Sequence, residues 1–209
     1  MIISLVGMSS SGKTYWAFEL QKHGFTRITC DDLIEMKLGP ELQKNGYRGL
    51  NDVAKWMGHP YEPQYPETSK KYLDFETRVM EEIFEEISSM NANKKRIVID
   101  TTGSVIYTPS SVIRTLQEIS SVIYLDIPDE KKMEIYQEFL RNPKPIIWGH
   151  SFKPIAGETN EESLARCYQD LLSFRATKYE KIADITIPFD IHRHVDFTAP
   201  DFIAHITSA

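Results

Sequence analysis

IISLVGMSSSGKTYW, residues 2–16, joins a short apolar run to a loop of the form Gly-x4-Gly-Lys-Thr. The apolar run predicts a buried strand, and the residues from 13 onward predict a helix. A glycine-rich loop between a strand and a helix is typical of phosphate-binding loops, since its backbone N–H groups converge on phosphate oxygens. The context that this motif requires is present, so the stretch predicts a site for a nucleotide triphosphate.

The positions of this loop have separate predicted roles. Gly7 lets the chain turn sharply off the strand, and Gly12 lets the backbone approach the phosphates. Lys13 is expected to reach the β- and γ-phosphates, and the Thr14 hydroxyl is expected to bind Mg²⁺. The nucleotide-binding residues predicted from the loop are Gly7, Ser9, Ser10, Ser11, Gly12, Lys13, Thr14 and Tyr15.

Further apolar, β-branched runs follow along the chain, at residues 25–29, 96–100, 122–127 and 184–189. Continuous apolar runs, as opposed to alternating ones, are typical of parallel strands that are covered on both faces. Helical patterns separate them, at residues 13–23, 69–90, 110–116, 129–136 and 160–182. This alternation predicts an α/β fold with a doubly wound parallel sheet.

Two segments interrupt the alternation and are predicted to be irregular. Residues 39–68 are rich in Gly, Pro and aromatic residues, and residues 141–159 combine prolines with basic residues. Long irregular segments inside a compact domain are usually lids or binding loops. With 209 residues, the chain is long enough for one such domain, spanning 1–209, and short for two.

Net charge, hydropathy and cysteine content indicate which kinds of partner and which cellular compartment to expect. The net charge of -6 argues against a general nucleic-acid binder and against long nucleic acid as a partner. No apolar stretch is long enough to cross a membrane, so no membrane partner is expected. Cys30 and Cys167 share no short motif, which disfavours a disulfide framework or a zinc site and favours a reducing compartment, the cytoplasm. The oligomeric state stays open.

Three carboxylates follow predicted strands. Asp31 and Asp32 come at the end of the run 25–29, and Asp100 closes the run 96–100. Ligands bind at this edge of an open parallel sheet, where a carboxylate can accept a proton from a hydroxyl or hold Mg²⁺. The aspartate pair can instead cap the next helix. The chain contains no Asn-Lys-x-Asp guanine-recognition motif and no second acidic residue beside Asp100 for hydrolysis, which favours a kinase over GTPases and motor ATPases.

The order of several motifs resembles that of shikimate kinases and related small-molecule kinases of the nucleoside-monophosphate-kinase class. The motifs are the phosphate loop, CDDLIE (30–35), VIDTTGS (98–104), VIYLDIP (122–128), RNPKPII (141–147) and RATKYEKIADITI (175–187). The resemblance excludes 39–68, parts of 141–159 and the last residues, 190–209. It implies a P-loop NTPase fold with a five-stranded parallel core and a mobile lid over 141–159. It also implies ATP and Mg²⁺ as cofactors and phosphoryl transfer to a hydroxyl of a small molecule.

The resemblance also implies roles for single residues, by position. The catalytic set is Lys13, Asp31, Arg141 and Lys144, with Asp31 contacting the acceptor hydroxyl and Lys144 matching a lid arginine. Arg175 matches an arginine that binds the acceptor's anionic group, and Gly103 is expected to lie beside the acceptor. The metal ligands are expected among Thr14, Asp32 and Asp100.

The departures from the family fall on the acceptor side. The family's Gly-Gly-Gly is Thr102-Gly103-Ser104 here, and its Phe-Arg-x-x-Glu aligns with residues 72–76, which places Leu73 at the position of the arginine clamp. A leucine cannot form a bidentate pair with a carboxylate, and Arg78 is either a replacement or a surface residue. We therefore expect residues 39–68 to help bind an acceptor other than shikimate.

Two alternatives remain open from the sequence. One is a kinase acting on a nucleotide or on a polynucleotide end, and the other is a nucleotide-binding module without transfer activity. His192, Arg193 and His194 in the tail are predicted to lie on a solvated, alternating polar strand.

Overall fold

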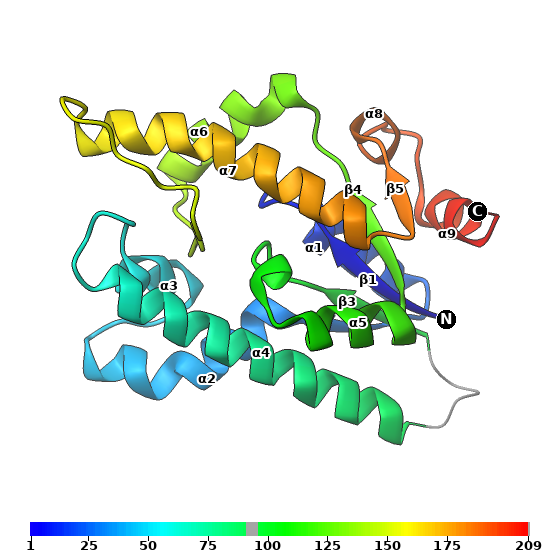
Figure 1. The fold of residues 1–209 in the computed structure, drawn as a ribbon. Helices are drawn as coiled ribbons and strands as arrows, with labels where there is room; N and C mark the ends of the chain where they lie inside the picture. Colours follow the sequence, from blue (N-terminus) through cyan, green and yellow to red (C-terminus); the bar gives the residue numbers. More distant parts are fainter. Residues whose placement is uncertain (91–95, 209) are drawn as a thin grey trace.

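A computed structural model describes residues 1–90 and 96–208 (Figure 1). Residues 91–95 and 209 of the predicted domain lie outside the described residues. The sheet has five parallel strands in the order β2-β3-β1-β4-β5. Their bounds are Ile2–Val6 (β1), Thr26–Thr29 (β2), Ile97–Asp100 (β3), Ser121–Leu125 (β4) and Ile185–Ile187 (β5). The predicted α/β fold, with a five-stranded parallel sheet flanked by helices, is confirmed.

The sheet is covered on both faces, and alternate residues of its central strand point to opposite sides. Ile3 and Leu5 of β1 pack on one side with Trp16 of α1 (Lys13–Lys22) and with α9 (Ala199–Thr207). Val6 belongs to the other cluster, which includes residues of α4 (Tyr65–Ser89), α5 (Ser110–Ile119) and α7 (Asn160–Ile182). This arrangement explains why the strands are apolar without alternation.

The segment 39–68 is largely helical, which corrects the prediction of an irregular region. α2 (Cys30–Lys44) continues through Pro40, and α3 (Leu50–Met57) follows it. Ile34, Leu38 and Leu42 are buried at helical spacing, so packing outweighs the local breaking signal of the Gly-Pro pair. The helices α2, α3 and α4 contact one another and form the group at the lower left of Figure 1.

The tail is also helical, where an alternating strand was predicted. α8 (Phe189–His192) follows Pro188, which ends β5, and it buries His192 against the carbonyl oxygen of Asp126 at 2.9 Å from Nε2. Phe202 of α9 lies with its ring centroid 4.9 Å from that of Trp16. The last helix is therefore part of the core on the α1 side of the sheet.

The 3₁₀ turn η2 (Val105–Tyr107) lies between β3 and α5. A second turn, η3 (Asp129–Lys131), and α6 (Lys132–Arg141) connect β4 to the predicted lid. In Figure 1 the connection from α6 to α7, which forms most of the lid, descends toward α3 and α4. Of the helices in the described part of the chain, none has both the length and the apolar character needed to cross a membrane.

Phe202→Ala is expected to lower the free energy of unfolding by roughly 3–5 kcal/mol, because it leaves a cavity against Trp16. Urea unfolding measures the change. Val195→Ala is the control, since Val195 is 93% exposed and should shift stability by less than about 0.5 kcal/mol. If both variants unfold alike, α9 is not part of the core.

Candidate active site at the carboxyl edge of the sheet

The phosphate loop adopts a backbone that its glycines permit. Gly7 has φ 148° and Gly12 has φ 101°, both in the region that side chains rarely adopt. A Cβ at position 7 would lie 2.8 Å from Ser11 Oγ and 2.9 Å from the carbonyl oxygen of Leu125. Ser10, at φ 65°, is the non-glycine residue with positive φ in the described chain. The loop thus folds back tightly between the ends of β1 and β4.

Lys13 lies folded over the loop that precedes it. Its Nζ donates to the carbonyl oxygens of Gly7 at 2.9 Å and of Met8 at 2.8 Å. Burial lowers the pKa of Lys13, while the charges of Asp100 and Asp31 oppose this shift and that of Arg175 adds to it. A buried ammonium group beside carboxylates and a glycine-rich loop is suited to bind phosphate oxygens.

One cavity of about 460 Å³ opens beside this loop. Its lining comes from the loop, the ends of β2 and β3, α4, the lid, α7 and the tail. The predicted site residues that line it are Ser9, Ser10, Gly12, Lys13, Thr14, Tyr15, Asp31, Asp32, Gly103, Lys144 and Arg175. The others lie outside its lining: Gly7, Ser11, Asp100 and Arg141. The phosphate loop and the predicted acceptor residues therefore share one cavity.

Asp31, at the start of α2, faces the cavity beside Tyr72. The Tyr72 hydroxyl donates to Asp31 Oδ1 over a long 3.4 Å. Burial raises the pKa of Asp31, and the charge of Asp100 adds to this rise. The charges of Lys13 and Lys144 and the hydrogen bond from Tyr72 lower the pKa but do not cancel the rise. A carboxylate with a raised pKa accepts a proton from a hydroxyl more readily than an ordinary aspartate does.

The residues around Asp100 fit a magnesium ion held partly by phosphates. Asp100 is 4% exposed, and its Oδ2 has no hydrogen-bond partner in the described protein. Burial raises the pKa of Asp100, while Lys13 and a hydrogen bond from Thr14 lower it. Asp32 is exposed nearby on the cavity lining. Mg²⁺ is usually held by one or two carboxylates together with waters and substrate phosphates, so a site built on Asp100 with Thr14 and Asp32 nearby is compatible with this ion.

Arg175 connects the cavity to the lid. Its Nη2 donates to the carbonyl oxygen of Ile147 at 2.8 Å, and its Nε has no partner within the described residues. A Cβ at Gly103 would come within 3.1 Å of Arg175 Nη1, so glycine leaves room for the guanidinium. The Tyr179 hydroxyl donates to the Gly103 carbonyl oxygen at 2.6 Å and fixes this loop against α7.

Glu76 of α4 is a site residue to which the sequence analysis assigned no role, although it aligns with the glutamate of the family's Phe-Arg-x-x-Glu motif. It is 1% exposed, and its carboxylate accepts from the hydroxyls of Thr102 and Ser104, the latter at 2.6 Å. Burial raises the pKa of Glu76 to about 7, although these two hydrogen bonds lower it. Its spacing, four residues after Tyr72 and three before Val79, was the available signal, because it places a charge within the apolar stripe of α4.

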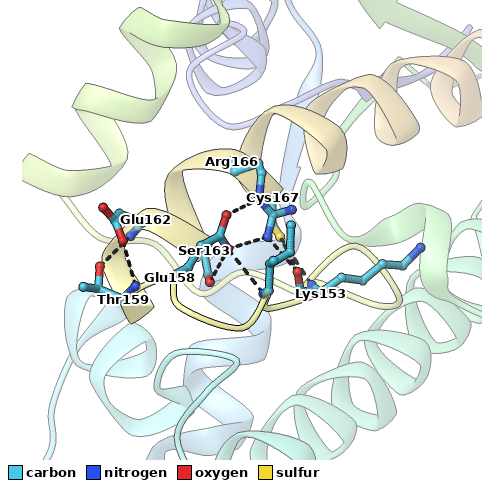
Figure 2. A network of polar contacts seen from close by, with 8 residues as sticks. Lys153, Glu158, Thr159, Glu162, Ser163, Arg166 and Cys167 are labelled. Atoms are coloured by element: carbon cyan, nitrogen blue, oxygen red, sulfur yellow. Dashed lines mark hydrogen bonds and ion pairs between the residues drawn. The ribbon is translucent and has the colours of Figure 1, made fainter.

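The lid is fixed at both ends of its loop. The Tyr65 hydroxyl donates to the Ile146 carbonyl oxygen at 3.0 Å and accepts from the Trp148 N–H at 2.8 Å. Figure 2 shows the second anchor, where Glu158 accepts from Arg166 Nε and from Ser163 Oγ, both at 2.8 Å. These contacts hold Lys144 over the cavity.

Arg141 and Arg193 lie at a second cavity of about 270 Å³, which continues from the phosphate loop along α6. Arg141 is exposed and pairs with Glu138 at 3.8 Å. Arg193 lines both cavities, and its Nη2 donates to the Ser10 carbonyl oxygen. The tail arginine, expected in a solvated segment, thus contacts the phosphate loop.

The fold is similar to that of solved kinases. Similar structures are the shikimate kinase from Bacteroides thetaiotaomicron (TM-score 0.61, 15% identity, covering 100% of this chain and 97% of that one) and the shikimate kinase from Acinetobacter baumannii in complex with shikimate (TM-score 0.58, 22% identity, 99% and 90%). Another is the dephospho-CoA kinase from Campylobacter jejuni (TM-score 0.55, 15% identity, 99% and 97%). No family model and no curated protein sequence matches the chain. The chain therefore shares the fold of these proteins, with five parallel strands flanked by helices.

The free energy of unfolding of Glu76→Gln is expected to rise relative to that of the wild type as the pH rises. The native state holds the Glu76 proton more tightly than the unfolded state, so the wild type loses stability between the ordinary pKa of 4.5 and about 7. The difference in free energy of unfolding between variant and wild type should change by up to roughly 3 kcal/mol from about pH 4.5 to about pH 8. Urea unfolding at each pH measures it. Glu81→Gln, on the exposed face of the same helix, should show no such trend. A difference that is constant with pH would contradict the assignment.

Proposed function

We propose that the protein transfers the γ-phosphoryl group of ATP to a hydroxyl of a small molecule. The observation that carries this proposal is the shared cavity, which Lys13 and Thr14 line together with Asp31 and Arg175. A phosphate-binding loop and a candidate base in one cavity can bring donor and acceptor into reach, and positioning accounts for much of phosphoryl-transfer catalysis. The P-loop kinase fold supports the same proposal.

In the proposed reaction, the acceptor oxygen bonds to the γ-phosphorus as the bond to the β–γ bridging oxygen breaks and ADP leaves. The hydroxyl proton passes to Asp31, whose raised pKa suits this role. Lys13 offsets the charge that develops on the phosphate oxygens. Thr14 and Asp100, with Asp32 nearby, would hold Mg²⁺, and this ion would neutralise part of the phosphate charge.

The acceptor side supports a substrate other than shikimate. Leu73, aligned with the family's arginine clamp, packs against the core and does not line the cavity. Arg78 does not take the place of the missing arginine, because it does not line the cavity. Its side chain is exposed, and its guanidinium lies 5.9 Å from the Phe75 ring centroid. The net charge of -6 favours a small molecule over long nucleic acid as the partner.

Lys13→Ala should lower kcat by at least about 100-fold, because it removes a charge that acts on the transferring phosphate. ADP release in the presence of an acceptor panel measures the rate. Lys22→Ala is the control, since Lys22 lies at the exposed end of the same helix, paired with Glu19. Equal rates in the two variants would contradict the role of Lys13.

Asp31→Asn should lower kcat by about 100-fold or more, because an amide cannot accept the hydroxyl proton. Affinity for a non-hydrolysable ATP analogue should remain close to that of the wild type. Asp74→Asn, an exposed position on α4, serves as the matched control. Full transfer by Asp31→Asn would contradict the proposed base. Slow wild-type ATP turnover that no acceptor stimulates would instead indicate a nucleotide-binding module.

A further inference from the structure

Thr102 and Ser104 form a polar wall of the main cavity, and Glu76 lies behind both of them. Both residues line the cavity, and they are 3% and 6% exposed. Ser104 Oγ donates to one carboxylate oxygen of Glu76 at 2.6 Å, and Thr102 Oγ1 donates to the other. The Ser104 N–H also donates to Thr102 Oγ1, at 3.1 Å. The two hydroxyls are therefore fixed from behind.

This arrangement sets which hydrogen bonds the wall can make. Above its pKa of about 7, the Glu76 carboxylate is ionised and only accepts, so each hydroxyl directs its single hydrogen to Glu76. What remains on the two oxygens are lone pairs, so toward a ligand this wall accepts hydrogen bonds and does not donate them. A ligand must present O–H or N–H groups to it.

A carboxylate would fit this wall poorly. It presents only lone pairs to the lone pairs of the two hydroxyl oxygens and would lie near the charge of Glu76, so at the wall nothing compensates its desolvation. Leu73 does not line the cavity, and the cations that do line it, Lys13, Lys144, Arg175 and Arg193, belong to the loop, the lid, α7 and the tail.

Arg175 supplies the complementary group beyond Gly103. Arg175 lines the same cavity as Thr102 and Ser104, and its Nη1 would lie 3.1 Å from a Cβ at Gly103. A ligand hydroxyl both donates and accepts, so it can donate to the wall while accepting from the guanidinium. A carboxylate can satisfy only Arg175.

We infer that the acceptor is a neutral polyhydroxylated molecule, of the class of sugars, polyols and nucleosides, and that the wall of Thr102 and Ser104 selects it over carboxylic acids of similar shape. The inference rests on the proposed function, since it concerns the acceptor of that reaction. Glu76 acts as a positioning residue, because it orients the two hydroxyls and does not line the cavity itself.

The test compares the binding of neutral and acidic partners that share a skeleton. Calorimetry at pH 8, with the protein saturated by a non-hydrolysable ATP analogue and Mg²⁺, would use glucose with glucuronate, glucitol with gluconate, and methyl shikimate with shikimate. The neutral partner should bind at least about tenfold more tightly wherever a pair binds. Equal or tighter binding of the acids, or no binding of any neutral partner, would overturn the inference.

Glu76→Gln tests the cause of the selection. The amide N–H₂ donates to one of the two hydroxyls, whose hydrogen then turns to the cavity and can bind a carboxylate. The preference for neutral partners should fall about tenfold, while Glu81→Gln should retain it. An unchanged preference in Glu76→Gln would overturn the inference, and retained binding of the ATP analogue shows that the variant is folded.

Transfer is measured separately, on the partners that bind. Selective binding of neutral partners without transfer contradicts the proposed function and supports the inference. Transfer to the acids with equal or greater efficiency contradicts the inference and leaves the proposed function standing.

Discussion

A Cβ at position 7 would lie 2.8 Å from Ser11 Oγ and 2.9 Å from the Leu125 carbonyl oxygen, so the turn after β1 can form only around glycine. That turn places the start of α1 at the centre of the sheet, between β3 and β4. The order of strands changes direction there, which opens a crevice at their carboxyl ends. The position of Lys13, and hence its approach to the carboxylates of neighbouring strands, depends on this one steric constraint.

The site concentrates ionisable groups that are otherwise costly to bury. Lys13, Glu76, Asp100 and Arg175 are each less than a tenth exposed. Burial disfavours the charged form of each. It therefore lowers the pKa of Lys13 and raises the pKa of Glu76 and of Asp100. Groups of this kind are retained in folds chiefly where they bind or react, which is a physical reason to regard the cavity as functional.

The strands and most helices could be predicted because their patterns are local. Two regions could not. At 39–68 the content of Gly, Pro and aromatic residues indicated an irregular segment, yet Leu38 and Leu42 are buried on either side of Pro40, and this packing maintains α2. In the tail, polar residues around His192 indicated an alternating strand, but the buried His192 ring lies 2.9 Å from the Asp126 carbonyl oxygen and belongs to a helical turn.

The sequence by itself determined the phosphate loop and the strand–helix alternation around it, because the residues concerned are adjacent in the chain and act through their own backbone. Tertiary structure decided which partners the acceptor-side residues have. Glu76 and Ser104 are 28 residues apart in sequence, and Arg193 reaches Ser10 across 183. Pairings over such separations leave no local pattern, since they exist only after the sheet has brought the carboxyl ends of its strands together.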